Sequence, residues 1–260
     1  MRTLLLKLIK ITCAFIPYSP WRKKARSFLT VALGCAISPE SNLAHQYCDG
    51  KNGVEIGASN QNSFGLDKTK SLYYNLDISE EQSNTNQMFK IQPAEVHLYA
   101  VGDALPIQKE CLDYVISSHV IEHFFDPIEA IKEWMRTLKP GGIIFMIVPH
   151  KERTIDRDRE ITPLQEHIQR HEKKLNISDY AHLDSPYAHQ RDHKVIDEET
   201  KRDKQWIPYQ KDDHHHWSVW TTESFLKMCQ HFNLDVIETQ NRDDKVGNGF
   251  TVILKKNSPL

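Results

Sequence analysis

The sequence predicts an α/β fold built on a doubly wound, largely parallel sheet, and three observations support this. Short apolar, β-branched runs alternate with helical patterns from residue 53 onward, as in successive βαβ units. The run at residues 143–148, IIFMIV, is continuously apolar, which is typical of a strand buried on both faces. The last two expected strands follow one another across a turn, so the sheet should end with an antiparallel strand.

The individual elements are expected where apolar runs meet turn and capping signals. We predict parallel strands at residues 54–58, 73–77, 96–101, 114–119 and 143–148, and a final pair at 234–239 and 250–254. A helix should begin after Asp126, because Asp126 can cap it and Pro127 suits its first position. The turn Pro140-Gly141-Gly142 should end this helix. A later helix should start at residues 221–224, TTES.

The composition divides the chain into three parts. Residues 1–40 form a basic N-terminal arm, residues 41–149 and 217–260 form the α/β domain, and residues 150–216 form an insertion after the fifth strand. The insertion is polar and highly charged, and it holds nine of the 14 histidines. Because it begins at the carboxyl end of a strand, where ligands bind in such sheets, we expect it to bind the substrate.

The arm carries seven basic residues and no acidic residue before Glu40, although the net charge of the chain is −2. Its apolar run ends at Ile16 and is interrupted by Lys7 and Lys10, so it is shorter than the roughly 20 residues of a spanning helix. Two interpretations remain open. Residues 1–28 form either an amphipathic helix on the anionic inner face of a membrane or a helix that packs on this protein or a partner.

The rest of the chain is acidic, which argues against a nucleic-acid partner. The five cysteines are odd in number and include no Cys-x-x-Cys pair. A disulfide framework is therefore not expected, and the sequence favours a reducing cytoplasm, with peripheral membrane contact through the arm as an addition.

Polar residues follow the first three strands in an order that suits a nucleoside. Gly57 ends the first strand, Asp77 ends the second about 20 residues later, and Asp103 follows the third. A carboxylate at the position of Asp77 can accept both ribose hydroxyls, and Gly57 would let backbone N–H groups approach a ligand. The stretch Gly57-Ala58-Ser59 has one glycine, so a G-x-G-x-x-G dinucleotide loop is not supported.

Together the motifs VEIGAS, NLDIS, GDALP, LDYVISSHVIEHFFDP and LKPGGIIFMIVP resemble the class I S-adenosylmethionine-dependent methyltransferases, in particular their type 11 branch. The resemblance implies a Rossmann-like seven-stranded sheet with an antiparallel last strand, and S-adenosylmethionine as cofactor. It places Glu55, Gly57, Ala58 and Ser59 in the first motif, Asp77 at the ribose, Asp103 and Ala104 at the adenine, and Ser118 and His119 beneath the methionine portion. Ser59 stands where the family has its second glycine.

The segments VPHKERTIDRDRE and DDHHHWSVWTTESF resemble a narrower subgroup, associated with bacterial surface-polysaccharide (O-antigen type) biosynthesis. This resemblance implies a saccharide acceptor and transfer to a hydroxyl. We predict His150 as the base, with Asp156 orienting it or binding the acceptor, and His215 as a further catalytic residue. A divalent cation that lowers the hydroxyl pKa is the alternative. The predicted substrate-binding residues are Arg153, Arg157, His214, His216 and Trp217.

Other interpretations stay open at this point. His167 and His171 are four residues apart on an expected helix and could share a metal ion, but no third ligand is in register, so we assign no metal ligand. Trp206, Trp217 and Trp220 could stack on a sugar ring. The alternative functions are a methyltransferase of a small metabolite or lipid, and a catalytically silent scaffold that binds polysaccharide-assembly proteins through the arm. The sequence leaves the oligomeric state open.

Overall fold

The computed structural model describes residues 41–58, 63–73, 95–175 and 216–257. The predicted arm (1–40) and the candidate residues Ser59, Asp77, His214 and His215 lie outside these ranges. In chain order the helices and strands are α3 (Asn42–Cys48), β1 (Gly53–Ile56), β2 (Thr69–Tyr73), β3 (Leu98–Tyr99), β4 (Leu112–Ser118), η1 (Ile121–His123), α5 (Pro127–Thr137), β5 (Leu138–Pro149), η2 (Lys151–Arg153), η3 (Ile155–Asp158), α6 (Leu164–Glu172), α9 (Thr222–His231), β6 (Asp235–Gln240) and β7 (Gly249–Lys255).

The strands form one seven-stranded sheet in the order β3-β2-β1-β4-β5-β7-β6. Strands β1 to β5 pair in parallel, and β7 runs antiparallel to both of its neighbours, β5 and β6. The predicted fold class is therefore confirmed, including the reversed final strand. That strand lies inside the sheet, with β6 on the edge beside it.

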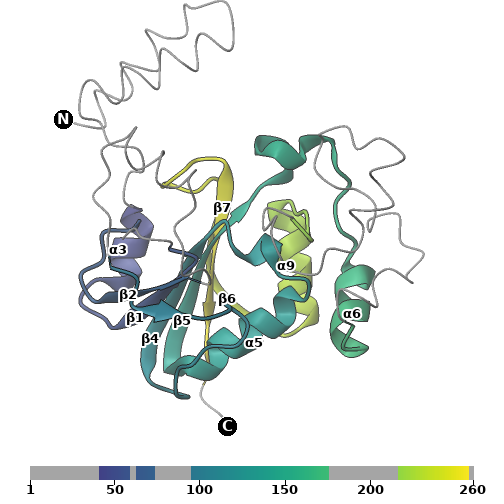
Figure 1. Cartoon of the computed structure of the whole chain (residues 1–260). Coiled ribbons are helices and arrows are strands. Elements are labelled where there is room, and N and C mark those ends of the chain that lie inside the picture. Colours follow the sequence, from purple (N-terminus) through teal and green to yellow (C-terminus); the bar gives the residue numbers. More distant parts are fainter. Residues whose placement is uncertain (1–40, 59–62, 74–94, 176–215, 258–260) are drawn as a thin grey trace, which may run out of the picture.

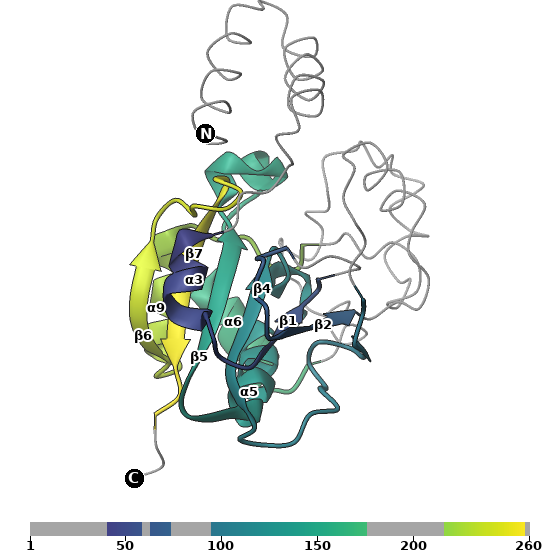
Figure 2. The ribbon, with the colours of Figure 1, turned by 90° about the vertical axis from the view of Figure 1, so that its left-hand side faces the viewer.

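Helices cover both faces of the sheet. Figures 1 and 2 show α3 on one face and α5, α6 and α9 on the other. Along β5, Phe145 and Ile147 pack in the cluster that includes α3, while Ile144, Met146 and Val148 pack in the cluster that includes α5 and α9. Successive strand residues point to opposite faces. The continuous apolar run of β5 is thus explained, because both of its faces are covered.

Helix α5 begins as the sequence predicts. Asp126 accepts hydrogen bonds from the backbone N–H groups of Ile128 (3.0 Å) and Glu129 (3.1 Å), and Pro127 occupies the first turn. The predicted end is wrong in one respect. The helix stops at Thr137, and residues 140–142 belong to β5, at a bulge where the pairing with β4 jumps from Leu138 to Ile143.

Strand β2 begins at Thr69, four residues before the predicted start, because residues 69–72 pair with β1. Its described part ends at Tyr73, and β3 is only two residues long. The predicted helix start at residues 221–224 is confirmed by a reciprocal capping box between Thr221 and Ser224. No helix in the described ranges has the length and apolar character needed to cross a membrane.

Candidate active site

The strand order reverses between β1 and β4, since β2 and β3 extend the sheet in one direction and β5 extends it in the other. In open parallel sheets, ligands bind outside the carboxyl ends of the strands at such a switch point. Ile56, the last residue of β1, pairs with Ser117, the penultimate residue of β4. The residues that follow these two strands, Gly57 and His119, therefore lie at the edge where a ligand is expected.

Glu55 is one of the predicted cofactor residues, and its side chain points into the protein. It is 3% exposed and accepts a hydrogen bond from the Ser63 hydroxyl. Burial raises the pKa of Glu55 to about 7, although Ser63 and the Lys245 ammonium act in the opposite direction. The carboxyl group thus links β1 to the turn at Ser63.

Gly57 makes the sharp turn after β1, with a φ of 72° that favours glycine. Its N–H donates to the carbonyl of Leu72 (3.0 Å), so this group does not face a ligand as the sequence analysis expected. A Cβ at Gly57 would meet the Cγ2 of Val120 at 2.6 Å. Glycine is therefore required for the turn itself and for the close approach of the loop after β4.

The other predicted cofactor residues that the structure describes surround the same edge. Ala58 is buried beside Gly57, Ser118 ends β4, and Asp103 and Ala104 are exposed in the turn after β3. The pKa of Asp103 is raised, first by partial desolvation and then by neighbouring carboxylates. His119 has a φ of 55°, and burial lowers the pKa of its ring, which favours a neutral imidazole.

His150, the predicted base, makes structural contacts. It pairs with Trp220 in an isolated β-bridge, and its ring Nδ1 accepts a hydrogen bond from the N–H of Glu152 (3.3 Å), which caps η2. The ring also meets the Phe250 ring edge-on, with centroids 6.0 Å apart. Burial lowers the pKa of His150. These contacts fix the entrance of the insertion to the end of β5.

Asp156 orients a different histidine from the one predicted. It pairs with His216, whose Nδ1 lies 2.6 Å from Oδ2, rather than with His150. Arg159 donates from Nη1 to the other oxygen of Asp156 (2.8 Å) and from Nη2 to the carbonyl of His216 (2.8 Å). These contacts join the start of the insertion to its end. His216, predicted to bind substrate, is thereby held by a buried carboxylate.

The pKa values of this pair move apart, as expected for an ion pair. Burial acts to raise the pKa of Asp156, but the bonds from His216 and Arg159 outweigh it and hold the pKa below its usual value. Burial acts to lower the pKa of His216, but Asp156 and the nearby Glu122 outweigh it and raise the pKa. The imidazole is therefore a stronger base than an exposed histidine.

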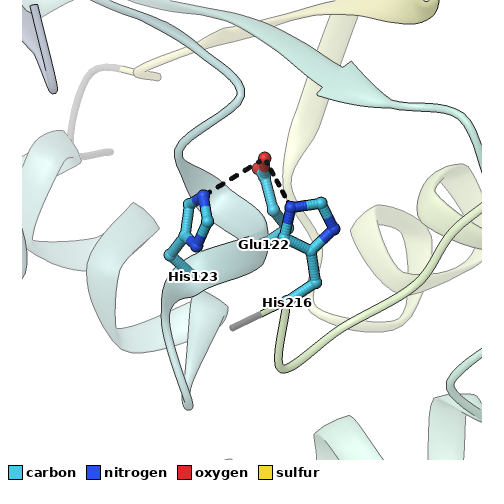
Figure 3. Close-up of side chains that lie close together, drawn as sticks. All are labelled: Glu122, His123 and His216. Carbon is cyan, nitrogen blue, oxygen red and sulfur yellow. Dashed lines mark ion pairs between the residues drawn. The ribbon is translucent and has the colours of Figure 1, made fainter. Parts of the chain in front are cut away.

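Glu122 lies at the centre of a group that the sequence analysis did not identify. Its Oε1 is 3.7 Å from Nε2 of His123 and 3.9 Å from Nε2 of His216. Figure 3 shows both rings directed at the carboxylate from opposite sides. We call Glu122, His123 and His216 the Glu122 cluster. The side chain of Glu122 is fully buried, and burial raises its pKa to about 7.

Buried contacts from α6 hold the segment that carries His216 next to the segment that carries Glu122 and His123. Arg170, which is fully buried, pairs with Glu166 and donates to the carbonyls of Phe125 (3.3 Å) and Trp217 (3.1 Å). The N–H of Trp217 donates to the carbonyl of Glu122 (2.8 Å). The segment that carries His216 is thus fixed against η1 by backbone contacts on both sides.

The signal for Glu122 is present in the sequence as His119-Val120-Ile121-Glu122-His123. Histidine spacing alone does not reveal this group, because one of its three members is the glutamate between two histidines. Its third partner, His216, is not predictable from spacing, because it arrives from the far end of the insertion.

The histidine pair at positions 167 and 171 does not share a site. His167 is buried and stacks on Trp220, whose indole N–H donates to its Nε2 (3.0 Å). His171 instead pairs through Nδ1 with Asp126 (2.8 Å), the residue that caps α5. Both rings therefore stabilise the packing of α6, and a metal ion shared by the two is not what the structure shows.

The remaining predicted substrate residues differ in their contacts. Arg153 donates to the carbonyl of Asn241 in the β6–β7 connection (2.6 Å), whereas Arg157 is exposed. Trp217 is partly buried and meets the Phe125 ring edge-on, with centroids 5.5 Å apart. Trp220 is buried against His167 and Phe225, so it does not offer a face to a sugar.

Comparison with known proteins supports one part of the sequence interpretation. Residues 54–146 match the family described as "Methyltransferase domain". A Mycolicibacterium smegmatis protein named "Probable S-adenosylmethionine-dependent methyltransferase" is 32% identical over 80 residues, which are 30% of this chain and 29% of that protein. The matched segment therefore spans less than a third of that relative's length.

Solved structures with a similar chain path include two S-adenosylmethionine-dependent methyltransferases. The one from Methanosarcina mazei has a TM-score of 0.46 and 12% identity, with 84% of this chain and 98% of that chain covered. The one from Aquifex aeolicus has a TM-score of 0.42 and 11% identity, with 80% and 84% covered. The family match over residues 54–146 supports a class I methyltransferase domain, and that family implies S-adenosylmethionine as cofactor.

Proposed function

We propose that this chain transfers a methyl group from S-adenosylmethionine to a hydroxyl of a saccharide, in a surface glycan or its precursor. One observation carries the proposal. The loop after β4 contacts the predicted cofactor side through Val120, which packs on Gly57, and two residues later it supplies Glu122 to the Glu122 cluster. A single short loop thus contacts the predicted binding site of the methyl donor and carries part of the Glu122 cluster.

The chemistry requires both components. S-adenosylmethionine supplies a methyl group on a positively charged sulfur, which is a good leaving group. A hydroxyl is a poor nucleophile, so alignment, worth roughly 7–11 kcal/mol, and a positioned base, worth about 10²–10⁴-fold, must both contribute. The hydroxyl oxygen forms the new bond to the methyl carbon, and the carbon–sulfur bond breaks with its electron pair remaining on sulfur. The hydroxyl proton is accepted by the carboxylate of Glu122.

The electrostatics of the cluster support this role. Asp156 holds Nδ1 of His216, so the opposite nitrogen, Nε2, faces Glu122 and the site. The pKa of Glu122 is about 7, and that of His216 is raised above 6.5. A carboxyl group with a raised pKa that faces an imidazole with a raised pKa, at the carboxyl edge of a sheet, is characteristic of acid–base chemistry.

The choice of a saccharide as acceptor draws on the insertion. Its resemblance to the polysaccharide-associated subgroup and its polar, charged composition favour a hydrophilic acceptor over a lipid. Of the three tryptophans considered for stacking, Trp217 is partly exposed near the cluster, Trp220 is buried, and Trp206 lies outside the described residues.

The direct test is incubation of the full chain with methyl-labelled S-adenosylmethionine and fractions of nucleotide sugars or glycans, with and without a chelator. Label in a saccharide supports the proposal. Label in a lipid or a small metabolite would keep the methyl transfer and overturn the acceptor. Calorimetry that detects no S-adenosylmethionine binding would instead favour the silent scaffold.

A second test addresses the ribose contact proposed for Asp77, which lies outside the described residues. Asp77→Ala should weaken S-adenosylmethionine binding by roughly 1–3 kcal/mol, because it removes charge-assisted hydrogen bonds. Calorimetry with Asp67→Ala, a change at an exposed turn residue, provides the control. Equal affinities of wild type and Asp77→Ala would remove Asp77 from the cofactor site.

The proposal extends to the basic arm, which we assign to peripheral contact with an anionic membrane. Its seven basic residues and short apolar run support this role. Deletion of residues 1–28 should move the protein from the membrane fraction to the supernatant. An unchanged distribution would favour the packing-helix interpretation.

A further inference from the structure

Glu122 is a fully buried carboxylate whose two oxygens receive no hydrogen bond from any residue that the structure describes. A buried charge without a partner is strongly unfavourable, so such groups are paired, neutralised or bound to a metal ion. The two nearest cationic candidates are the rings of His123 and His216, at 3.7 and 3.9 Å from Oε1. Both distances exceed those of a hydrogen bond. A small cation between the three groups would satisfy all of them.

We propose that Glu122, His123 and His216 bind a divalent transition-metal ion. One ligand atom from each of the three residues lies within 4.8 Å of the others. Metal–ligand bonds of about 2.0–2.2 Å place ligand atoms roughly 3–3.5 Å apart. The widest-spaced ligand atoms therefore need to close by roughly 1–2 Å at most on the ion, which rotation of the partly exposed His123 can supply.

The surroundings of the three residues match those of metal ligands. A ligating histidine commonly donates its other ring N–H to a carboxylate, which fixes its tautomer and orientation. Asp156 holds Nδ1 of His216 in this way, and Arg159 in turn holds Asp156. The raised pKa of Glu122 agrees with a carboxylate that lacks its counter-charge, because burial is the main cause of that shift.

The ligand types indicate which ions fit. Two imidazole nitrogens and one carboxylate oxygen suit Zn²⁺, Mn²⁺, Co²⁺ or Fe²⁺, whereas Mg²⁺ and Ca²⁺ prefer oxygen ligands. Three protein ligands leave at least one position open, as in catalytic metal sites. The role of that position rests on the proposed function: the acceptor hydroxyl would bind there, and the ion would lower its pKa before methyl transfer.

The test is binding of Mn²⁺ alone to the chelator-treated full chain, followed by electron paramagnetic resonance, with a Co²⁺ absorption spectrum as a second readout. We expect one ion per chain. Glu122→Gln, which keeps the size of the side chain, and His123→Ala, at a partly exposed position, should each weaken binding at least 10-fold. Asp156→Asn should weaken it about 10- to 100-fold, because the orientation of His216 is lost.

Two matched controls separate this site from adventitious binding by other histidines. His171→Ala removes a histidine that is also paired with an aspartate, and the double variant His189→Ala/His193→Ala removes two histidines of the insertion. Both should retain wild-type Mn²⁺ affinity. The proposal is overturned if wild type does not bind Mn²⁺, if Glu122→Gln and His123→Ala, folded by circular dichroism, bind it normally, or if the controls lose it equally.

Failure of this inference differs from failure of the proposed function. Methyl transfer to a saccharide without any Mn²⁺ binding, and without inhibition by chelator, would remove the metal and leave the methyltransferase. Mn²⁺ binding that depends on Glu122, without methyl transfer to any fraction, would establish the metal site and remove the function.

Discussion

Two groups of histidines and carboxylates each include residues from the segment 122–129, which leads into α5, and they differ in how well their carboxylates are satisfied. One is the Glu122 cluster, and the other consists of Asp126, Glu129 and His171. Each contains a histidine whose Nδ1 is held by an aspartate, at 2.6 Å for His216 with Asp156 and 2.8 Å for His171 with Asp126. Both groups combine carboxylates with histidines, although the Glu122 cluster has two histidines and one carboxylate and the other group has the reverse.

Their hydrogen bonds distinguish them. Asp126 accepts two backbone N–H groups of α5 in addition to His171, and Glu129 is 64% exposed. That group is a helix cap with a histidine attached. Glu122 is fully buried, and no donor in the described part of the chain reaches its oxygens. The unsatisfied buried carboxylate, rather than the number of histidines, is thus the reason that we propose a functional role for the Glu122 cluster and not for the other group.

The largest expected effect comes from the matched pair of histidine substitutions. His216→Ala should lower the turnover of methyl transfer by about 10²-fold or more, because it removes the group that faces Glu122. His171→Ala should change turnover less than about twofold. The measurement is the rate of S-adenosylhomocysteine formation at saturating S-adenosylmethionine, with calorimetry to show that both variants bind the methyl donor normally. Equal losses in the two variants would erase the distinction between the groups.

The next effect is a pH dependence of stability that separates His167 from its neighbour His171. Burial, and then the nearby Arg170, lower the pKa of His167 to about 3. The unfolded chain therefore binds a proton at His167 near pH 6.5, whereas the folded protein does not bind one until about pH 3. The free energy of unfolding is therefore unaffected by this histidine above pH 6.5, and it falls as the pH drops toward 3. At pH 5 the free energy of unfolding should be about 2 kcal/mol lower than at pH 8 because of this histidine.

His167→Gln should remove this part of the acid sensitivity, even if it lowers stability at pH 8, whereas His171→Gln should not. Urea unfolding at pH 8 and pH 5 measures both differences. An unchanged difference between the two pH values in His167→Gln would show that His167 is not the group that titrates.

The smallest effect concerns the helix cap. Asp126→Ala should destabilise the protein by about 1 kcal/mol, because two N–H groups of α5 lose their acceptor, and it should leave Mn²⁺ binding unchanged. Urea unfolding and the Mn²⁺ titration provide the two readouts. A loss of Mn²⁺ binding in Asp126→Ala would make the cap group, and not the Glu122 cluster, the metal site.

The fold could be predicted largely because its signals are local. The cap at Asp126, the apolar run of β5 and the capping box at Thr221 each depend on residues within one element or turn. The start of β2 was predicted wrongly because it depends on pairing with another strand and not on a local signal. Its pairing with β1 places Thr69 opposite Gly53, and no periodicity in the stretch 69–77 encodes that register.

Candidate residues at the strand ends could be placed from sequence more readily than the contacts around His216, for the same reason. Gly57 and Ser118 follow directly from strand ends, although the N–H of Gly57 proved to be used within the sheet. Asp156 and His216 are 60 residues apart in the sequence, and no spacing rule predicts that they meet in the structure. His150 was the natural choice of base from sequence because it follows β5 directly, yet its ring caps η2.

The contact between Gly57 and Val120 has a consequence for how the affinities of the two proposed ligands, the nucleoside and the metal ion, depend on each other. A Cβ at position 57 would come within 2.6 Å of Val120, so the turns after β1 and β4 are tightly packed against each other. A nucleoside that repositions the first turn must displace the second, and with it Glu122. Reciprocity of linked equilibria then requires that the factor by which the nucleoside changes ion affinity equals the factor by which the ion changes nucleoside affinity.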